Sequence, residues 1–271
     1  MRRFLTTLAF VLAIGTSLAP LVWMAETSLK SNREISQDGT LYPHAWTGQN
    51  FRSLFSGRQF GSYLTNSIVI TGVSVLVSLV LGTLAAYSIA RFRLWRGAKR
   101  WVAIGLLTAR ILPPIVIVVP AYLLMQRLGL LNSRLGLIVI YTAFNVSFVV
   151  WMMESFFREI PVDLEEAAMV DGDSRFTAFR RIVLPLAAPG LAATAIFAVI
   201  VTSNEFLFAL VLTSTPDAET MPVGAATLIG RINVDWGAMS AAGVVGALPI
   251  VVFAVLVQRH LVRGLTMGAV K

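Results

Sequence analysis

Residues that could carry covalent or acid–base chemistry are scarce in this chain of 271 residues. There is no cysteine, which excludes disulfides, thiol catalysis and thiolate metal sites. The two histidines, His44 and His260, both lie outside the apolar segments, and no nucleophile–base pairing is visible. No G-x-x-x-x-G-K-[ST] stretch occurs, so the chain cannot cradle ATP phosphates with a P-loop. We therefore expect no catalytic residue, no metal site and no cofactor bound by this chain.

Half of the acidic residues lie instead in one short segment between two long apolar blocks. Pro161 breaks the preceding helix, and Asp163 is expected to be the N-cap of a short helix. Its first turn holds Glu165 and Glu166, where carboxylates are favoured because the N-terminal end of a helix is positive. Residues 154–181 contain seven of the 14 acidic residues: Glu154, Glu159, Asp163, Glu165, Glu166, Asp171 and Asp173.

Two short amphipathic helices are predicted around Gly172, which permits the backbone reversal that ends the first. Each of the two helices has one apolar face, with residues at helical spacing. Pro185 is expected to end the second helix because it interrupts the backbone hydrogen bonds. An ordinary loop against lipid headgroups is the alternative, but the negative cytoplasmic leaflet attracts basic segments. We therefore interpret the segment as a docking element for another protein. The two faces consist of Leu164, Ala167 and Ala168, and of Phe176, Phe179, Ile182 and Val183.

The elements around this segment are typical of a membrane protein. Hydrophobic residues make up 56% of the chain, charged residues 13%, and the mean hydropathy is +0.77. Soluble domains carry about 25% charged residues, and long apolar runs without strand-like alternation favour helices over a barrel. The sequence predicts an all-α, multi-pass membrane domain covering 1–271.

Six spans of about the length needed to cross a bilayer are predicted. The first follows the basic start Met1-Arg2-Arg3 and resembles a signal peptide, but its long apolar core favours a retained anchor. The spans are approximately 4–25, 62–90, 103–126, 135–153, 186–212 and 236–258, and the acidic loop is 154–181.

Basic residues set the orientation. The two termini, the 91–100 loop and the 154–181 loop together hold 14 Lys and Arg, whereas the opposite connections hold seven. The positive-inside rule therefore places both termini and the acidic loop in the cytoplasm. It also accounts for the formal net charge of +8 without a nucleic-acid partner.

Polar residues inside the spans are the candidates for a solute path. Glu205 with Asn204, and Arg110, either line a cavity or serve in structural pairing, because intramembrane charges are costly. Asn66 and Asn145 could bind hydroxyl groups and Phe148 could stack on a ring, but each such residue taken alone is more often a helix-packing contact or a membrane-interface aromatic. In the 213–235 connection, Asp217, Met221 and Asp235 are candidates for contact with an extracytoplasmic protein, the alternative being a plain outer connector.

The acidic loop also resembles a known signature. Glu166-Ala167-Ala168, Gly172, Ile182, Leu184-Pro185 and Pro189 are similar to the EAA loop of binding-protein-dependent ABC import permeases. Other segments resemble the carbohydrate permeases of the maltose MalG type: Asn204-Glu205-Phe206-Leu207-Phe208-Ala209-Leu210, Arg110 before Leu112-Pro113, Asp235-Trp236-Gly237, and Gly264 through Lys271.

The resemblance implies a type I ABC importer permease fold with a cytoplasmic coupling helix. It implies a second homologous permease, two ATP-binding subunits that hold ATP and Mg, and an extracytoplasmic sugar-binding protein, in the cytoplasmic membrane of a bacterium. It implies that Glu166, Ala167, Ala168, Asp171, Gly172, Phe176 and Lys271 contact the ATPase. A disaccharide of maltose or trehalose size is the expected substrate.

Two other functions remain open from the sequence. Import permeases for polyamines or other solutes share the EAA pattern. An ion-coupled secondary transporter would work without an ATPase, but such proteins commonly have more embedded carboxylates and repeated halves.

Overall fold

Helices make up most of the part of the chain that the structure describes. The computed structural model describes residues 2–37, 42–57, 59–92, 111–230 and 234–268, with residues 97, 101, 104, 105 and 108. Within these residues, β-type pairing is limited to one isolated bridge between Ile229 and Val234. The predicted all-α class is confirmed.

Among the described residues, four helices are long and apolar enough to cross a membrane. They are α1 (Arg2–Ser28), α4 (Phe60–Arg91), α7 (Arg134–Glu159) and α14 (Trp236–Gly268). They contain the predicted spans 4–25, 62–90, 135–153 and 236–258.

The other two predicted spans differ from the structure or lie partly outside it. The predicted 186–212 span is two helices, α11 (Ala188–Ser203) and α12 (Leu207–Leu212). Before α11 the chain bends by 71°, and the segments on either side of this bend can together make a fifth span. Of the predicted 103–126 span, the structure describes mainly α6 (Pro114–Arg127), which has 14 residues. The count of six spans therefore stays a prediction.

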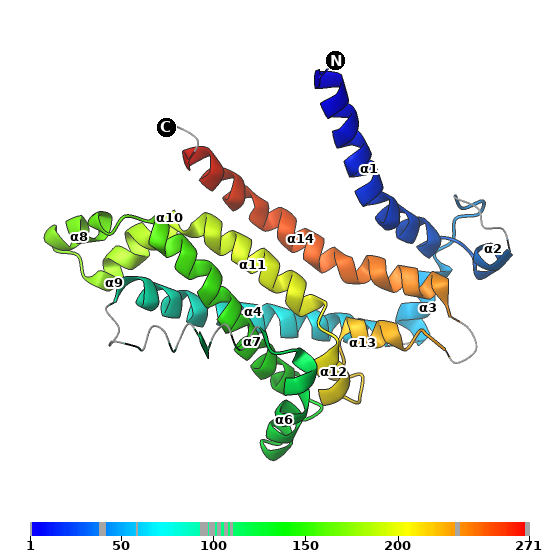
Figure 1. Cartoon of the computed structure of the whole chain (residues 1–271). Coiled ribbons are helices and arrows are strands. Elements are labelled where there is room, and N and C mark those ends of the chain that lie inside the picture. Colours follow the sequence, from blue (N-terminus) through cyan, green and yellow to red (C-terminus); the bar gives the residue numbers. More distant parts are fainter. Residues whose placement is uncertain are drawn as a thin grey trace.

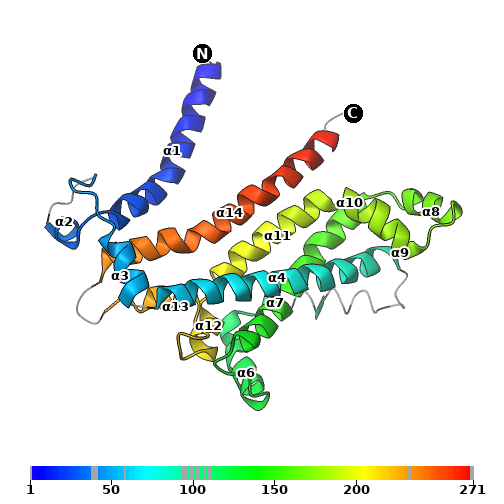
Figure 2. The same ribbon diagram turned by 180° about the vertical axis from the view of Figure 1, so that it is seen from behind.

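Short helices gather at the two ends of the molecule, and α4 runs between them (Figures 1 and 2). At one end lie α2 (Asn32–Gln37), α3 (Gln49–Gly57) and α13 (Met221–Ala226). At the other lie α8 (Asp163–Val170), α9 (Arg175–Ala178), the π-helix η1 (Phe179–Val183) and α10 (Leu184–Leu186).

The core is built on the contact between α4 and α7, the most extensive helix pair in the described chain. Gly82 of α4 lies so close to α7 that an added Cβ would be 2.6 Å from the side chain of Val149. Small residues let membrane helices approach in this way. Near the α8 end, Tyr87, Phe157 and Phe179 close the core as an aromatic cluster, with ring centroids 4.5 to 6.2 Å apart.

Helix α1 diverges from the rest of the molecule (Figure 1). Its apolar side chains are exposed along the first part of the helix, including Phe4 and Phe10, and its contacts are mainly with α14. A helix that is apolar all round and exposed is suited to lipid or to another apolar surface rather than to water.

Candidate functional site

The acidic segment folds into a helical knob, defined here as residues 162–183. Its first helix, α8, starts at Asp163, and the N-cap is Val162, which provides no side-chain hydrogen bond. The prediction that Asp163 is the N-cap was therefore wrong by one residue. Asp163 still lies with Glu165 and Glu166 in the first turn, where their charges favour the helix end.

Gly172 ends α8 as predicted. Its φ is +99°, its N–H donates to the carbonyl of Met169 (3.2 Å), and the N–H of Asp173 donates to that of Ala168 (3.0 Å). This pair of bonds is the Schellman motif, which needs a left-handed residue after the helix. Nothing lies within 4 Å of a Cβ built on Gly172, so the requirement is one of backbone conformation rather than space.

The second predicted helix is shorter and less regular than the pattern suggests. Ser174 caps α9 by accepting a hydrogen bond from the Thr177 N–H (3.2 Å). The chain then passes through the π-helix η1 and α10, so Pro185 does not end it, and the sharp bend comes just after Leu186. Single π turns inside helices are frequent at functional sites.

The apolar faces predicted for the knob are only partly buried. Phe179, Val183 and Ala168 face inward, but Leu164 and Ala167 are exposed, and Phe176 is 66% exposed. The side chain that sequence reasoning missed is Glu165, which is buried. The carboxylate of Glu165 accepts from the Tyr87 hydroxyl (2.6 Å) and pairs with the Arg91 guanidinium, both from the end of α4.

The outer side of the knob is an unpartnered mixed surface. It carries four large exposed apolar side chains, Val162, Leu164, Val170 (86% exposed) and Phe176, together with the exposed Glu166 and Asp171. Beside Phe176, a hollow of about 430 Å³ is lined by Thr177, Arg180 and Arg181. Apolar surface rimmed by charged groups is typical of a protein interaction site. Lys271 and Arg110 lie outside the described residues.

The predicted path residues Asn66 and Asn145 each donate hydrogen bonds to another segment of the chain. The Asn66 amide, fully buried, donates to the carbonyls of Pro216 (2.9 Å) and Glu219 (2.7 Å). The Asn145 amide donates to the Thr202 hydroxyl at 2.7 Å. Phe148 packs against a small cluster formed by Val75, Ala198 and Val199. In this structure Asn66 ties α4 to the 213–220 loop, whereas Asn145 and Phe148 serve packing between helices.

Glu205 and Asn204 occupy the break between α11 and α12. Glu205 accepts from the N–H groups of Phe208 (3.0 Å) and Ala209 (3.3 Å), which open α12. It also accepts from the Tyr141 hydroxyl of α7 at 2.6 Å. Asn204 is exposed and donates to the carbonyl of Ile200 at 2.8 Å. The Glu205 carboxylate thus serves as a helix cap and as a tie to α7.

A groove of about 390 Å³ lies elsewhere, between α4, α11 and α14. Its walls are mostly apolar, with hydroxyl groups from Ser67, Thr71 and Ser203. None of Asn66, Asn145, Phe148, Asn204 and Glu205 lines it.

The outer-loop candidates differ in exposure. Asp217 is exposed, whereas the Met221 side chain is buried near Phe60 and Tyr63. The Met221 N–H donates to the Ser67 hydroxyl at 2.7 Å. Asp235 caps α14 by accepting from the Ala238 N–H at 3.1 Å.

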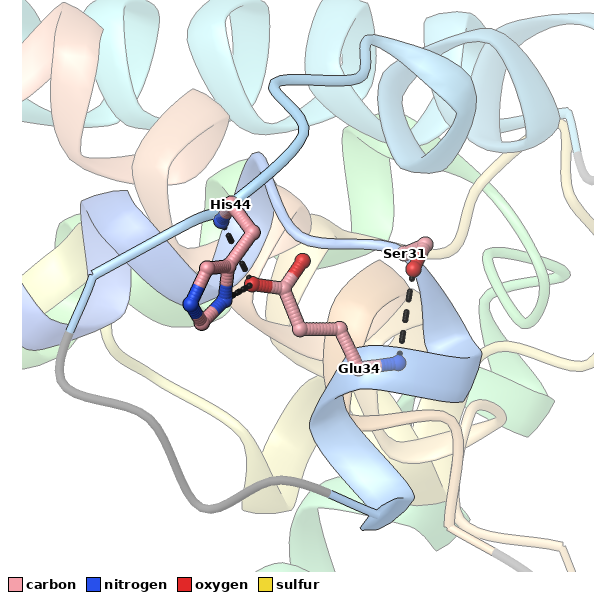
Figure 3. Close-up of polar contacts among 3 residues, drawn as sticks. All are labelled: Ser31, Glu34 and His44. Carbon is pink, nitrogen blue, oxygen red and sulfur yellow. Dashed lines mark hydrogen bonds and ion pairs between the residues drawn. The ribbon is translucent and has the colours of Figure 1, made fainter.

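The segment that contains α2 and His44 is held by one carboxylate, as Figure 3 shows. Glu34 of α2 accepts from the backbone N–H of His44 (2.7 Å), and the His44 Nδ1 lies 3.1 Å from the same oxygen. The bond from the His44 N–H, with smaller contributions from the His44 ring and the Lys30 charge, lowers the pKa of Glu34 from its usual value. The Ser31 hydroxyl accepts a hydrogen bond from the Glu34 N–H at 3.3 Å, which supports the first turn of α2.

This lowered pKa predicts acid sensitivity of the segment that contains α2 and His44. Because the folded pKa is lower than the unfolded one, the ionised carboxylate stabilises the fold above about pH 4.3, and the contribution is lost as pH falls further. We expect protease cleavage around α2 to increase below about pH 4 and to be steady from pH 5 to 7. In Glu34→Gln this acid step should vanish, with cleavage raised at every pH. An unchanged acid step in that variant would assign the effect to another group.

Comparison with known proteins identifies the class. Residues 78–267 match the family described as "Binding-protein-dependent transport system inner membrane component", and the chain belongs to that family. The membrane location and the resemblance inferred from the EAA loop are confirmed. Proteins of this family are membrane subunits of transport systems.

Individual relatives cover nearly the whole chain. It is 39% identical over 262 residues to the trehalose transport system permease protein SugB of Mycobacterium tuberculosis, covering 96% of this chain and 94% of that protein. It is 34% identical over 274 residues to the trehalose/maltose transport system permease protein MalG of Thermococcus litoralis, covering 100% and 98%. Its fold is similar to a chain of a bacterial ABC transporter involved in the import of alginate, with a TM-score of 0.77, 23% identity, and coverage of 95% and 96%.

Proposed function

We propose that the chain is the permease subunit of an ATP-driven importer for a disaccharide delivered by an extracytoplasmic binding protein. The two relatives named above are permeases of trehalose and trehalose/maltose systems, each matched over nearly its full length. Their identities, 39% and 34%, support a sugar of that size as the substrate class.

The knob is the observation that carries this proposal. It exposes Val170 and Phe176 to solvent, while its inner side is fixed to α4 by Glu165. An exposed apolar surface on a well-anchored element is suited to docking a second protein. Since the chain has no P-loop, we assign the docked partner as an ATP-binding subunit.

The proposed assembly contains this chain, a homologous second permease and two ATP-binding subunits. ATP and Mg are held by the latter, and closure of that pair moves the knob and switches the cavity between the permeases. The chain is one membrane domain with six spans, both termini and the knob in the cytoplasm of a bacterium. Its solute path includes the groove of α4, α11 and α14, completed by the second permease. Asp217, exposed in the outer loop, is the residue we assign to contact with the binding protein.

Reconstitution of the complete transporter tests the function. The complex purified through a tag on this chain is placed in liposomes, with the binding protein outside and ATP inside. We expect radiolabelled trehalose or maltose to enter the liposomes only when the binding protein and ATP are both present. Neither ionophores nor excess spermidine should change this uptake. Uptake that persists without ATP and stops with an ionophore would establish a secondary transporter instead.

Glu166→Ala tests the knob without disturbing the fold. The side chain is exposed, so we expect a stability change within about 0.5 kcal/mol. Sugar transported per ATP hydrolysed should fall about tenfold, within the usual range of coupling between sites. Glu159→Ala, an exposed carboxylate at the end of α7, is the control and should keep the wild-type ratio. Equal ratios in both variants would remove Glu166 from the coupling surface.

A further inference from the structure

We infer that Glu165 is the positioning residue that joins α8, the first helix of the knob, to α4, and that α4 carries movement of the knob to the outer loop. This inference rests on the proposed function and adds the route by which coupling is transmitted. It begins with the way in which α8 is held.

The attachment of α8 to the spans is polar. Of its eight residues, only Glu165 and Ala168 are buried, and its apolar Leu164 and Val170 point away from the core. Its main helix contacts are with α9 and η1, which belong to the knob itself. A helix with so little buried apolar surface is located by its hydrogen bonds rather than by packing.

Glu165 makes those bonds to α4, and both carboxylate oxygens are used. One accepts from the Tyr87 hydroxyl at 2.6 Å and the other pairs with the Arg91 Nε. The Arg91 Nη2 also donates to the carbonyl of Ile160 at the end of α7, at 2.8 Å. The side chains of Arg91 and Glu165 are 4% and 5% exposed, so water does not compete for the pair. Knob, α4 and α7 therefore meet at one buried ion pair.

The opposite end of α4 holds the outer loop. Asn66 donates to the carbonyls of Pro216 and Glu219, and Ser67 accepts from the Met221 N–H. Between these ends α4 is an unbroken helix of 32 residues, about 48 Å long at 1.5 Å per residue. It also supplies Ser67 and Thr71 to the groove. One helix thus reaches the knob at one end and the 213–220 loop at the other (Figure 1). Between them it lines the groove.

The ion pair acts as a fixed joint in this arrangement. Removing one charge leaves the other buried and unpaired, which loosens the contact between α8 and α4. The exposed knob surface that docks the ATPase is unchanged by this. Glu165→Gln and Arg91→Gln should therefore keep the ATP-binding subunits bound while weakening transmission.

The test uses the complete transporter in liposomes, with the ratio of sugar moved per ATP and the stimulation of ATP hydrolysis by the binding protein as readouts. We expect Glu165→Gln and Arg91→Gln each to lower the ratio of sugar moved per ATP about tenfold and to abolish the stimulation of ATP hydrolysis by the binding protein. The purified complexes should still contain the full amount of ATP-binding subunits. Tyr87→Phe, which keeps the ring, should lower it about twofold to threefold. The double variant should be no worse than either single one, because the two residues act as one joint.

A control pair separates transmission from general stability. Glu154 and Arg158 form an exposed ion pair on α7, with Oε1 and Nη2 in direct contact, and their Gln variants should keep the wild-type ratio. A normal ratio in Glu165→Gln, or loss of the ATP-binding subunits from that complex, overturns the inference. If the transporter with Glu165→Gln does not assemble at all, the Tyr87→Phe variant takes its place. A normal ratio of sugar moved per ATP in Tyr87→Phe then overturns the inference. Failure of the wild-type complex to import sugar with ATP overturns the proposed function instead.

Discussion

Gly172→Pro is expected to abolish ATP-driven uptake while the spans remain assembled. Gly172 has a φ of +99°, whereas proline is fixed near −65°. The substitution also removes the N–H that donates to Met169. A proline in an incompatible position costs about 3 kcal/mol or more, which corresponds to a loss of more than about a hundredfold in the population of the native knob.

Uptake and ATP hydrolysis by the reconstituted complex measure this effect. Gly172 is exposed and nothing lies within 4 Å of a Cβ built on it, so the amount of assembled transporter should stay close to wild type. Gly172→Asn is the matched control, because Asn tolerates the left-handed region best among non-glycine residues. It should retain most of the activity. Full uptake by Gly172→Pro would contradict a coupling role for the knob.

The Gly172 turn could be predicted because it depends on local sequence. A glycine six residues after Glu166, at the end of an apolar periodicity, is enough to indicate a helix C-terminus. The apolar runs likewise predicted the four long helices, since hydropathy over about 20 residues is also a local property.

The orientation of Glu165 could not be predicted in this way. Three carboxylates in the first turn of an eight-residue helix all suggest solvent exposure, and periodicity over two turns is too short to rank them. What buries Glu165 is Arg91, 74 positions away in the sequence. A contact of that separation is set by tertiary packing, and a single sequence carries no signal for it.

The polar residues of the spans show the same limit. Asn66, Asn145 and Glu205 were candidates for the solute path because buried polar groups need partners. Each finds its partner within the chain, from segments 57 to 153 positions away. The break at 204–206 also escaped prediction, because hydropathy stays high across it while Glu205 replaces the missing backbone bonds of α12.

Glu205→Ala is expected to lower the free energy of unfolding by about 2–4 kcal/mol. The change removes the cap of α12, which contributes about 1 kcal/mol. It also leaves the buried Tyr141 hydroxyl without its acceptor, which costs about 1–3 kcal/mol more. Tyr141→Phe removes only the link to α7 and should cost about 1 kcal/mol. Thermal unfolding of the purified complex in detergent, following the fraction still assembled, measures both.

The same variants decide whether Glu205 also touches the sugar. A residue that only holds α12 and α7 together changes the amount of functional transporter, so the maximal uptake rate should fall while the KM for sugar stays within about twofold. Glu205→Gln keeps the size of the side chain and can still accept one N–H bond, so it should lie between wild type and Glu205→Ala in stability. If Glu205→Gln unfolds like the wild type but raises KM about tenfold, the carboxylate belongs to the solute path and its bond to Tyr141 is a secondary feature.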